Sequence, residues 1–261
     1  MTRAPHPRVA PLLLATDLDG TFAGGADPDR QALYTRLGHR ARCTLCYATG
    51  RHLESAWALE DAVRLPRPDY YIADVGATVA SGERGRPIGF PESDLLRRWP
   101  GADHLRGLLA ALETALEPQR LPTDRRLSFV VREGCAFGDT VRRVRVALAE
   151  SDVEVIGSAD TYVDILPGGV NKGSTLQRVV QWLGVDSASV VVAGDSLNDL
   201  ALFEAGFKGI VVGNAEPPLR QAAERLPQVY RADGHGARGV HEGLRFFGFL
   251  DGEGLTAGGG V

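Results

Sequence analysis

The chain has 261 residues, 44% of them hydrophobic and 24% charged, which is ordinary for a globular protein with one large domain or a core with a smaller insert. Its 29 basic and 33 acidic residues give a net charge of -4 without a long run of either sign, and this pattern argues against a nucleic-acid-binding protein. No apolar stretch approaches the roughly 20 residues of a membrane span, and residues 1–11 lack the apolar segment of a signal peptide, so we expect a cytoplasmic protein that does not enter a membrane.

The first predicted strand, residues 12–18, begins with an apolar run and leads directly into a pair of carboxylates. Asp17 and Asp19 belong to the sequence Asp-Leu-Asp-Gly-Thr, in which Gly20 allows the chain to turn and Thr21 adds a hydroxyl. Ligands of parallel sheets bind just past the ends of the strands, where both carboxylates can face one pocket. Two carboxylates that close repel each other unless a cation or a shared proton offsets the repulsion. The sequence therefore predicts either a catalytic or metal site or an ordinary acidic turn.

The second predicted strand, residues 44–49, ends in the sequence Ala-Thr-Gly-Arg and precedes a helix predicted over residues 52–63. Thr49 offers a hydroxyl, Gly50 lets the backbone approach a ligand, and Arg51 adds a cation. We expect these groups at the same edge of the sheet as the first pair of carboxylates, although a plain turn contains the same kinds of residue.

Two of the three cysteines, Cys43 and Cys46, have the spacing of a redox motif. Reactive cysteine pairs open helices, where the thiolate is stabilised, whereas these two lie in a run that resembles a strand. We therefore expect both to be small buried residues, and all three cysteines, Cys135 included, fit a reducing compartment. The six histidines show no metal-ligand spacing, and we assign none of them to chemistry.

The middle of the chain, from about residue 82 to residue 159, has a different pattern from the flanking segments. Short alternating strands and two amphipathic helices are predicted in and next to it, at residues 103–116, 127–132, 138–150, 153–156 and 161–166. This pattern predicts a smaller α+β cap inserted into the core.

A polar cluster follows the predicted cap. Asn171 and Lys172 open a helix predicted over residues 174–183. Free backbone N–H groups at a helix start and the lysine ammonium both favour an anion. A solvated lysine at a helix start is the alternative interpretation.

The strand predicted over residues 190–194 ends in the sequence Gly-Asp-Ser-Leu-Asn-Asp. It adds two more carboxylates, Asp195 and Asp199, and the amide of Asn198. A capping arrangement for the next helix would use the same residues. Each cluster alone has such an explanation, but four clusters at predicted strand ends or helix starts are difficult to explain as turns.

Outside the middle segment, strands and helices alternate along the chain, which predicts an α/β fold. The sheet is expected to be a doubly wound, mainly parallel, Rossmann-like core with an inserted smaller α+β cap. Further core strands are predicted at residues 70–74 and 209–213, and further helices at residues 199–205 and 218–226. We expect the core to cover residues 1–82 and 160–251, the cap residues 83–159, and a disordered, Gly-rich tail residues 252–261.

In this order, the four polar sequences resemble the four motifs of the haloacid dehalogenase (HAD) superfamily of phosphohydrolases. The long segment between the second and third motifs resembles subfamily IIB, in which the C2 cap is inserted at that place. Within this group the chain is most similar to the bacterial sucrose-6-phosphate phosphatases. The sequences that carry this similarity lie at residues 47–51, 68–71, 75–76, 163–167, 171–173, 230–232 and 239–244. Two positions depart from the family pattern: Phe22, where Trp is common, and Leu197, where Gly is common.

The resemblance implies a Mg2+-dependent phosphoric monoester hydrolase that converts sucrose 6-phosphate to sucrose and phosphate. Asp17 would be the nucleophile that forms an aspartyl-phosphate intermediate. Asp19 would be the general acid and then the general base, with a pKa raised by burial and by neighbouring carboxylates. Asp17, Asp195 and the backbone carbonyl of Asp19 would hold Mg2+, while Asp199 would act directly or from the second coordination shell.

The same resemblance implies which residues bind the two parts of the substrate. Phosphate would be bound by Thr49, Gly50, Lys172 and Asn198. The cap and its hinge would recognise the sugar, with candidates Arg51, Asp164 and Asn171.

Two alternatives to sucrose 6-phosphate phosphatase remain open at this point. One is a phosphatase for another glycosyl or hexose phosphate, such as mannosylfructose phosphate or an aminosugar phosphate. The other is a non-catalytic phosphosugar-binding partner of a synthase, whose sequence would lack the nucleophile or a metal ligand. The expected partner in every case is a small phosphorylated sugar, and the oligomeric state is open, with a monomer compatible with the sequence.

Overall fold

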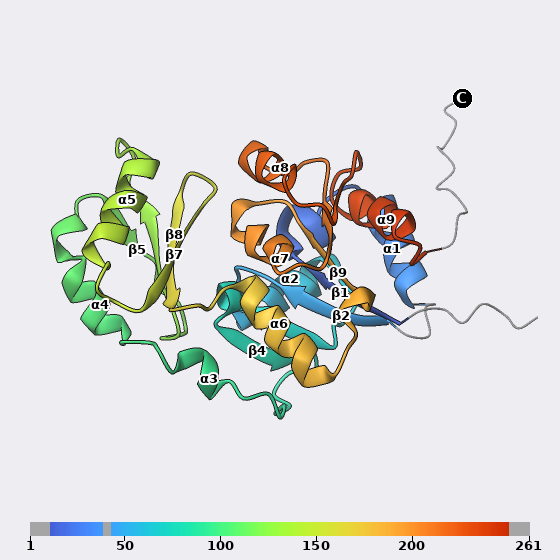
Figure 1. Cartoon of the computed structure of the whole chain (residues 1–261), viewed down its shortest axis with the longest axis horizontal. Coiled ribbons are helices and arrows are strands. Elements are labelled where there is room, and N and C mark those ends of the chain that lie inside the picture. The colour runs from blue at the N-terminus through green and yellow to red at the C-terminus, as the bar shows by residue number, and fades with distance from the viewer. Residues whose placement is uncertain (1–10, 39–42, 251–261) are drawn as a thin grey trace, which may run out of the picture.

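The computed structural model describes residues 11–38 and 43–250 of the chain. It contains a seven-stranded sheet with helices on both faces and a four-stranded sheet beside it (Figure 1). The tail that we expect to be disordered, residues 252–261, lies outside the described residues. None of the helices in the described part of the chain is long and apolar enough to cross a membrane.

The large sheet has the strand order β11, β10, β9, β1, β2, β3 and β4. All neighbouring strands are parallel except β3 and β4, so the prediction of a doubly wound, mainly parallel core sheet is confirmed. The two edge strands that the sequence did not predict, β4 and β11, have only four and three residues. The strands are β1 (Leu12–Thr16), β2 (Cys43–Ala48), β3 (Tyr70–Ala73), β4 (Thr78–Ser81), β9 (Val190–Gly194), β10 (Lys208–Val211) and β11 (Val229–Arg231).

Strand β1 explains why helices cover both faces of this sheet. Leu12 and Leu14 belong to one apolar layer, whereas Leu13 and Ala15 belong to the other, and all four are buried. A strand buried on both faces has a continuous apolar sequence, as residues 12–15 do. The first layer is covered by α1 (Asp27–Gly38), α2 (Leu53–Val63) and α9 (Ala237–Phe246), and the second by α6 (Lys172–Leu183), α7 (Leu200–Glu204) and α8 (Pro217–Ala223) (Figure 1).

The small sheet is antiparallel and has an apolar core of its own, which includes Leu105, Val144 and Ile165. We call residues 102–167 the cap, which is drawn in green to yellow in Figure 1. A short helix, α3 (Ser93–Leu96), lies in the segment that leads from the core. The cap consists of α4 (Ala102–Leu108), β5 (Leu116–Pro118), β6 (Leu127–Val131), α5 (Phe137–Ala147), β7 (Val153–Ser158) and β8 (Tyr162–Pro167), in the strand order β5, β6, β8 and β7.

Two details of the cap differ from the sequence-based expectation. Residues from 160 onward were expected in the core, but β8 pairs with both β6 and β7, so the cap sheet extends to Pro167. A single helix was expected over residues 103–116, but α4 ends at Leu108 and Leu116 begins β5. A 3-10 helix, Ala110–Leu112, follows α4, and from Leu116 onward the pairing of β5 with β6 overrides the helical spacing of the leucines.

Buried Cys46 lies in β2, as the sequence predicts. Burial raises the pKa of its thiol to about 12, and the nearby charge of Asp69 acts in the same direction. Since a redox pair needs an accessible thiolate, this environment agrees with a packing role.

Candidate active site

Lys172 is a fully buried cation at the start of α6, and its ammonium joins segments that are distant in sequence. Lys172 Nζ donates to Asp17 Oδ1 at 2.8 Å and to Asp199 Oδ1 at 2.6 Å. It also donates to Asn198 Oδ1 at 2.5 Å. Burial lowers the pKa of Lys172, but the charges of Asp17 and Asp199 outweigh burial and hold it above its ordinary value. The ammonium is therefore charged where the first, third and fourth motifs meet.

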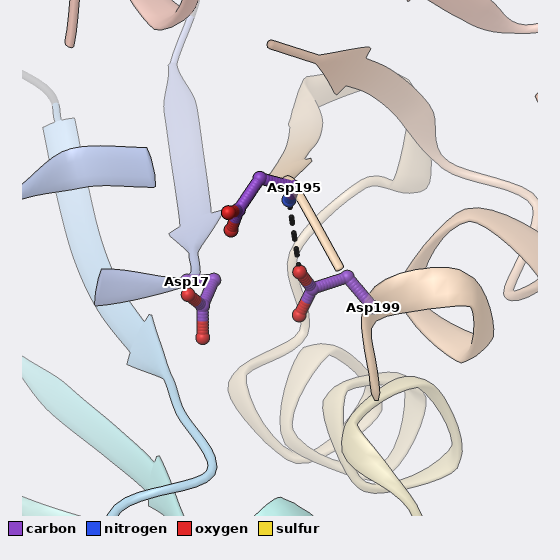
Figure 2. Close-up of side chains that lie close together, drawn as sticks. All are labelled: Asp17, Asp195 and Asp199. Atoms are coloured by element: carbon purple, nitrogen blue, oxygen red, sulfur yellow. Dashed lines mark hydrogen bonds between the residues drawn. The ribbon is translucent and has the colours of Figure 1, made fainter. Parts of the chain in front are cut away.

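Three carboxylates lie together, as Figure 2 shows, and two of them, Asp17 and Asp199, accept from the Lys172 ammonium. Asp17, Asp195 and Asp199 offer oxygen atoms within 4.8 Å of one another. Asp17 follows β1 and Asp195 follows β9, and these two strands are parallel neighbours. Burial is the main cause of the raised pKa values of Asp17 and Asp195, and that of Asp195 rises to about 7, with the charge of Asp199 adding to the effect. Repelling carboxylate oxygens of this kind form a donor set that suits a hard divalent cation.

Asp199 is the most constrained of the three carboxylates. Its Oδ2 accepts hydrogen bonds from the backbone N–H groups of Asp195, at 3.0 Å, and Ser196, at 3.1 Å. Figure 2 shows the first of these bonds. A Cβ on Gly194 would lie 2.5 Å from the Asp199 side chain, which explains the glycine before Asp195. Since its Oδ1 binds Lys172, both oxygens of Asp199 already have partners.

The first motif also positions Asp195. Thr21 Oγ1 donates to Asp195 Oδ1 at 2.8 Å. Gly20 has a φ of +70°, and a Cβ there would lie 2.2 Å from Asp195 Oδ2. The glycine therefore allows both the turn and the close approach of the second carboxylate.

Asp19 is close to the cluster but lies in an environment that differs from the expected one. Arg51 binds it through two hydrogen bonds of 2.7 Å, from Nε to Oδ2 and from Nη2 to Oδ1. The Asp19 side chain is 55% exposed, so the burial that we expected for this carboxyl group is absent. Arg51 also donates to Ser55 Oγ at 2.7 Å and lines the cavity. Its contact with Asp19 was not expected, and its role in binding the sugar stays a prediction.

A cavity of about 590 Å³ lies between the motifs of the core and the cap. Asp164, a predicted sugar ligand, lines it, but Asn171 does not. The Asn171 side chain instead caps α6, because its Oδ1 accepts from Ser174 N at 2.8 Å. The core contributes Asp17, Asp19, Gly50, Arg51, Asp195 and Asn198 among others, and the cap contributes Gln119, Leu121, Arg126, Ser158, Tyr162 and Asp164.

Sequence reasoning missed three residues of this site. Thr21 belongs to the first motif, so its position could have indicated a role beside Asp195. His52 lines the cavity and its ring caps α2, although no histidine was assigned to the site. Arg126 lies in no motif, and only the pairing of β6 with β8 brings it to Asp164, so one sequence offers no signal for it.

Known proteins resemble this chain over most of its length. The chain is 40% identical over 247 residues to a glucosylglycerol-phosphate synthase from Pseudomonas anguilliseptica; the match covers 94% of this chain but only 32% of that protein. The chain thus spans about one third of the length of this relative. It is 29% identical to a mannosylfructose-phosphate phosphatase from Agrobacterium fabrum, over 90% of this chain and 96% of the relative.

A solved structure and a family model cover almost the whole chain. The sucrose-phosphatase from Synechocystis, in complex with sucrose and phosphate, aligns with a TM-score of 0.82 and 30% identity over 92% of this chain and 99% of that one. The family model described as sucrose-6F-phosphate phosphohydrolase matches residues 10–248. The chain therefore belongs to the sucrose-6F-phosphate phosphohydrolase family, in subfamily IIB of the HAD superfamily, and is a phosphoric monoester hydrolase of the sugar-phosphate phosphatase type.

Proposed function

We propose that this chain is a Mg2+-dependent phosphatase for the phosphate ester of a glycoside, with sucrose 6-phosphate as the leading substrate. One observation carries the proposal: Asp17 and Asp195 line a cavity that residues of the core and the cap form together, and the buried ammonium of Lys172 donates to Asp17. A carboxylate beside a buried ammonium and further acidic oxygens is the arrangement that phosphoryl transfer requires.

Asp17 is the proposed nucleophile. Its carboxylate attacks phosphorus in line, so the bond to the sugar oxygen breaks as an aspartyl phosphate forms. Asp19 gives its proton to the departing sugar oxygen and then takes one from the water that hydrolyses the aspartyl phosphate. Phosphate leaves, and Asp17 is restored. For the first step Asp19 must hold a proton and separate from Arg51.

The donor set fits Mg2+. Asp17, Asp195 and the backbone carbonyl of Asp19 would hold the ion. Asp199 supports this site from the second shell, because both of its oxygens are already bound by Lys172 and by backbone N–H groups. An ion held there would supply positive charge that offsets the repulsion between the Asp17 carboxylate and the phosphate oxygens.

Residues around the buried ammonium are proposed to bind the phosphate group. Lys172 supplies the positive charge, and Asn198, whose Oδ1 accepts from Lys172 Nζ, lines the cavity. Buried Thr49 accepts from the backbone N–H of Arg51 at 3.1 Å, which leaves its own hydroxyl proton available for a phosphate oxygen. Gly50 permits close approach of the loop.

The cap is proposed to select the sugar. A cavity of about 590 Å³ has a volume within the range of small-ligand sites, and its cap residues carry amide, hydroxyl and carboxylate groups that suit sugar hydroxyls. The family model and the sucrose-phosphatase from Synechocystis favour sucrose 6-phosphate.

A second candidate substrate is glucosylglycerol phosphate. The relative named glucosylglycerol-phosphate synthase is 40% identical over 94% of this chain, compared with 30% for the sucrose-phosphatase structure and 29% for the mannosylfructose-phosphate phosphatase. The name of this relative contains a glycoside phosphate, and we therefore include that ester as a second candidate substrate of this chain.

A phosphate-release assay decides between these substrates. Sucrose 6-phosphate, glucosylglycerol phosphate, mannosylfructose phosphate and glucosamine 6-phosphate are compared with and without Mg2+. We expect one of the first two to exceed the others by about 100-fold in kcat/KM, and turnover to require the metal. Asp17→Asn is expected to remain folded by circular dichroism and to lose activity by about 10⁴-fold or more. Equal kcat/KM on all four esters would exclude a dedicated glycoside phosphatase.

A further inference from the structure

Arg126 lies at the junction of the cap and the core, and its side chain is 6% exposed. Nη1 donates to Asp164 Oδ1 in β8 at 2.8 Å, and Nη2 donates to the backbone oxygen of Gly50 at 2.8 Å. Nε lies 3.2 Å from Asp74 Oδ1, in the core. One planar guanidinium thus contacts a carboxylate of the cap, a carboxylate of the core and the loop that carries Thr49.

The core partner of Arg126 belongs to a strained turn that supports this loop. Asp74 and Val75 have φ values of +52° and +56°, a conformation that is costly for residues other than glycine. The backbone N–H of Asp74 donates to the oxygen of Arg51 at 2.9 Å, and that of Val75 to the oxygen of Thr49 at 3.1 Å. These two backbone hydrogen bonds therefore hold the loop of residues 49–51 in place.

The same turn contacts the helix that carries Lys172. Thr175 Oγ1 donates to the backbone oxygen of Gly76 at 2.8 Å. A Cβ on Gly76 would lie 2.4 Å from the carbonyl carbon of Asn171, so the two segments are in close contact. A shift of Asp74 would thus displace both segments that are proposed to bind phosphate, the loop of residues 49–51 and the start of α6.

On the cap side, Arg126 fixes a residue of the cavity wall. Asp164 Oδ1 accepts from Arg126 and also from the hydroxyl of Ser128. This orients the carboxylate and leaves Oδ2 without a hydrogen bond from a described residue. Arg126 and Asp164 both line the cavity, so the guanidinium sets where this sugar-facing carboxylate stands relative to the loop.

We propose that Arg126 is a positioning residue that couples the cap to the phosphate-binding loop and so makes turnover depend on a substrate whose sugar reaches the cap. The inference rests on the proposed function, since it assumes a glycoside phosphate in the cavity. A small aryl phosphate does not reach Asp164, and its turnover depends less on Arg126.

The neighbouring arginine is a matched control. Arg125 also joins the cap to the segment leading from the core, through Glu92, with Nη1 to Oε1 at 3.0 Å and Nη2 to Oε2 at 3.2 Å. Its side chain is 28% exposed and it does not line the cavity. Loss of this pair removes a link of the same chemical type away from the site.

Kinetics of Arg126→Met, Arg126→Lys and Arg125→Met in the full chain test the proposal with two substrates, the preferred glycoside phosphate and p-nitrophenyl phosphate. We expect Arg126→Met to lower kcat/KM about 100-fold for the glycoside phosphate and less than about tenfold for p-nitrophenyl phosphate. Arg126→Lys keeps the positive charge but lacks the planar guanidinium. We expect its loss of kcat/KM for the glycoside phosphate to be smaller than that of Arg126→Met. The kcat/KM of Arg125→Met is expected to stay within about fivefold of the wild-type value on both substrates. Equal losses on both substrates, or no loss, would overturn the proposal.

Hydrogen exchange at residues 74 and 75 tests the coupling without any substrate. Their amides are expected to exchange about tenfold faster or more in Arg126→Met, and at the wild-type rate in Arg125→Met. Unchanged exchange in Arg126→Met would overturn the coupling whatever the substrate is. Failure of the wild-type protein to hydrolyse any glycoside phosphate, together with faster exchange in Arg126→Met, would instead refute the proposed function alone.

Discussion

Asp19 and Arg51 form a pair that the proposed acid step has to separate. Two charge-assisted hydrogen bonds of 2.7 Å join the Arg51 guanidinium to the Asp19 carboxylate. The two side chains are 55% and 33% exposed, so solvent screening reduces the contribution of the pair to about 1 kcal/mol or less. Substrate binding can supply this free energy. Arg51 then pairs with the proposed general acid only while no substrate is bound.

Asp19→Asn is predicted to separate the two chemical steps. We expect kcat for a glycoside phosphate to fall by about 100-fold or more, because a sugar oxygen leaves poorly without a proton. The release of p-nitrophenolate needs no proton, so the first turnover of p-nitrophenyl phosphate should stay fast and the second step should become limiting. Rapid-mixing absorbance measurements would then show a burst of nitrophenolate. Equal losses in the first turnover of both substrates would contradict the assigned role.

At the scale of elements, the contact between α6 and α7 determines where Lys172 stands. A Cβ on Gly173 would lie 1.8 Å from the backbone oxygen of Ala201 in α7. This close approach explains the glycine of the third motif, because any larger residue would push α6 away. The helix carries Lys172 at its first residue, so the packing of the two helices and the geometry of the site are coupled.

Gly173→Ala is therefore predicted to destabilise the protein by about 3 kcal/mol through overpacking. It should also lower activity, since Lys172 moves with α6. Urea unfolding followed by circular dichroism measures the first effect. Gly107→Ala is the control, because a Cβ there meets nothing within 4 Å inside α4, and the change is expected to be neutral or to stabilise by up to about 1 kcal/mol. Equal stability of the two variants would contradict this account.

The elements that carry the site were predictable because each motif directly follows an apolar strand or opens a helix. β1, β2 and β9 lie side by side in parallel, so their ends bring Asp17, Gly50 and Asp195 to one edge of the sheet. Edge strands β4 and β11 were not predictable, since short edge strands bury little and their pairing is set by tertiary contacts. The same reason applies to β5, which begins at Leu116, the last leucine of a segment with helical spacing.

For the whole molecule, the contacts between the core and the cap lay beyond sequence reasoning. Arg126 meets Gly50 and Asp164 only because two sheets, formed by different parts of the chain, face one cavity. The pairing of Asp19 with Arg51 depends likewise on side-chain positions that motif spacing does not specify. The chemistry of the site follows from local patterns, whereas the sugar-facing wall depends on how the two sheets are placed.

The balance of charge in the site makes the stability of the whole molecule depend on pH and metal. Asp195 has a pKa of about 7 in the folded protein, above its ordinary value of 3.8, mainly because of burial. Between these two values the folded state holds a proton that the unfolded state has lost. The resulting stabilisation is complete below about pH 4 and is lost as pH rises through about 7. The raised pKa of Asp17 acts in the same direction.

Mg2+ is predicted to restore this stability at the pH at which Asp195 is ionised. At pH 8 and a 100-fold excess over Kd, we expect the ion to raise Tm by roughly 5–10 °C. At pH 5, two units below the pKa, proton competition lowers the apparent affinity about 100-fold, so the same Mg2+ concentration should raise Tm by only about 1 °C. Scanning calorimetry with KCl at matched ionic strength as the control measures both shifts. Asp195→Asn should reduce the dependence of the Tm shift on pH and leave the smaller part that comes from Asp17. An equal Tm increase at both pH values would show that Asp195 does not hold the ion.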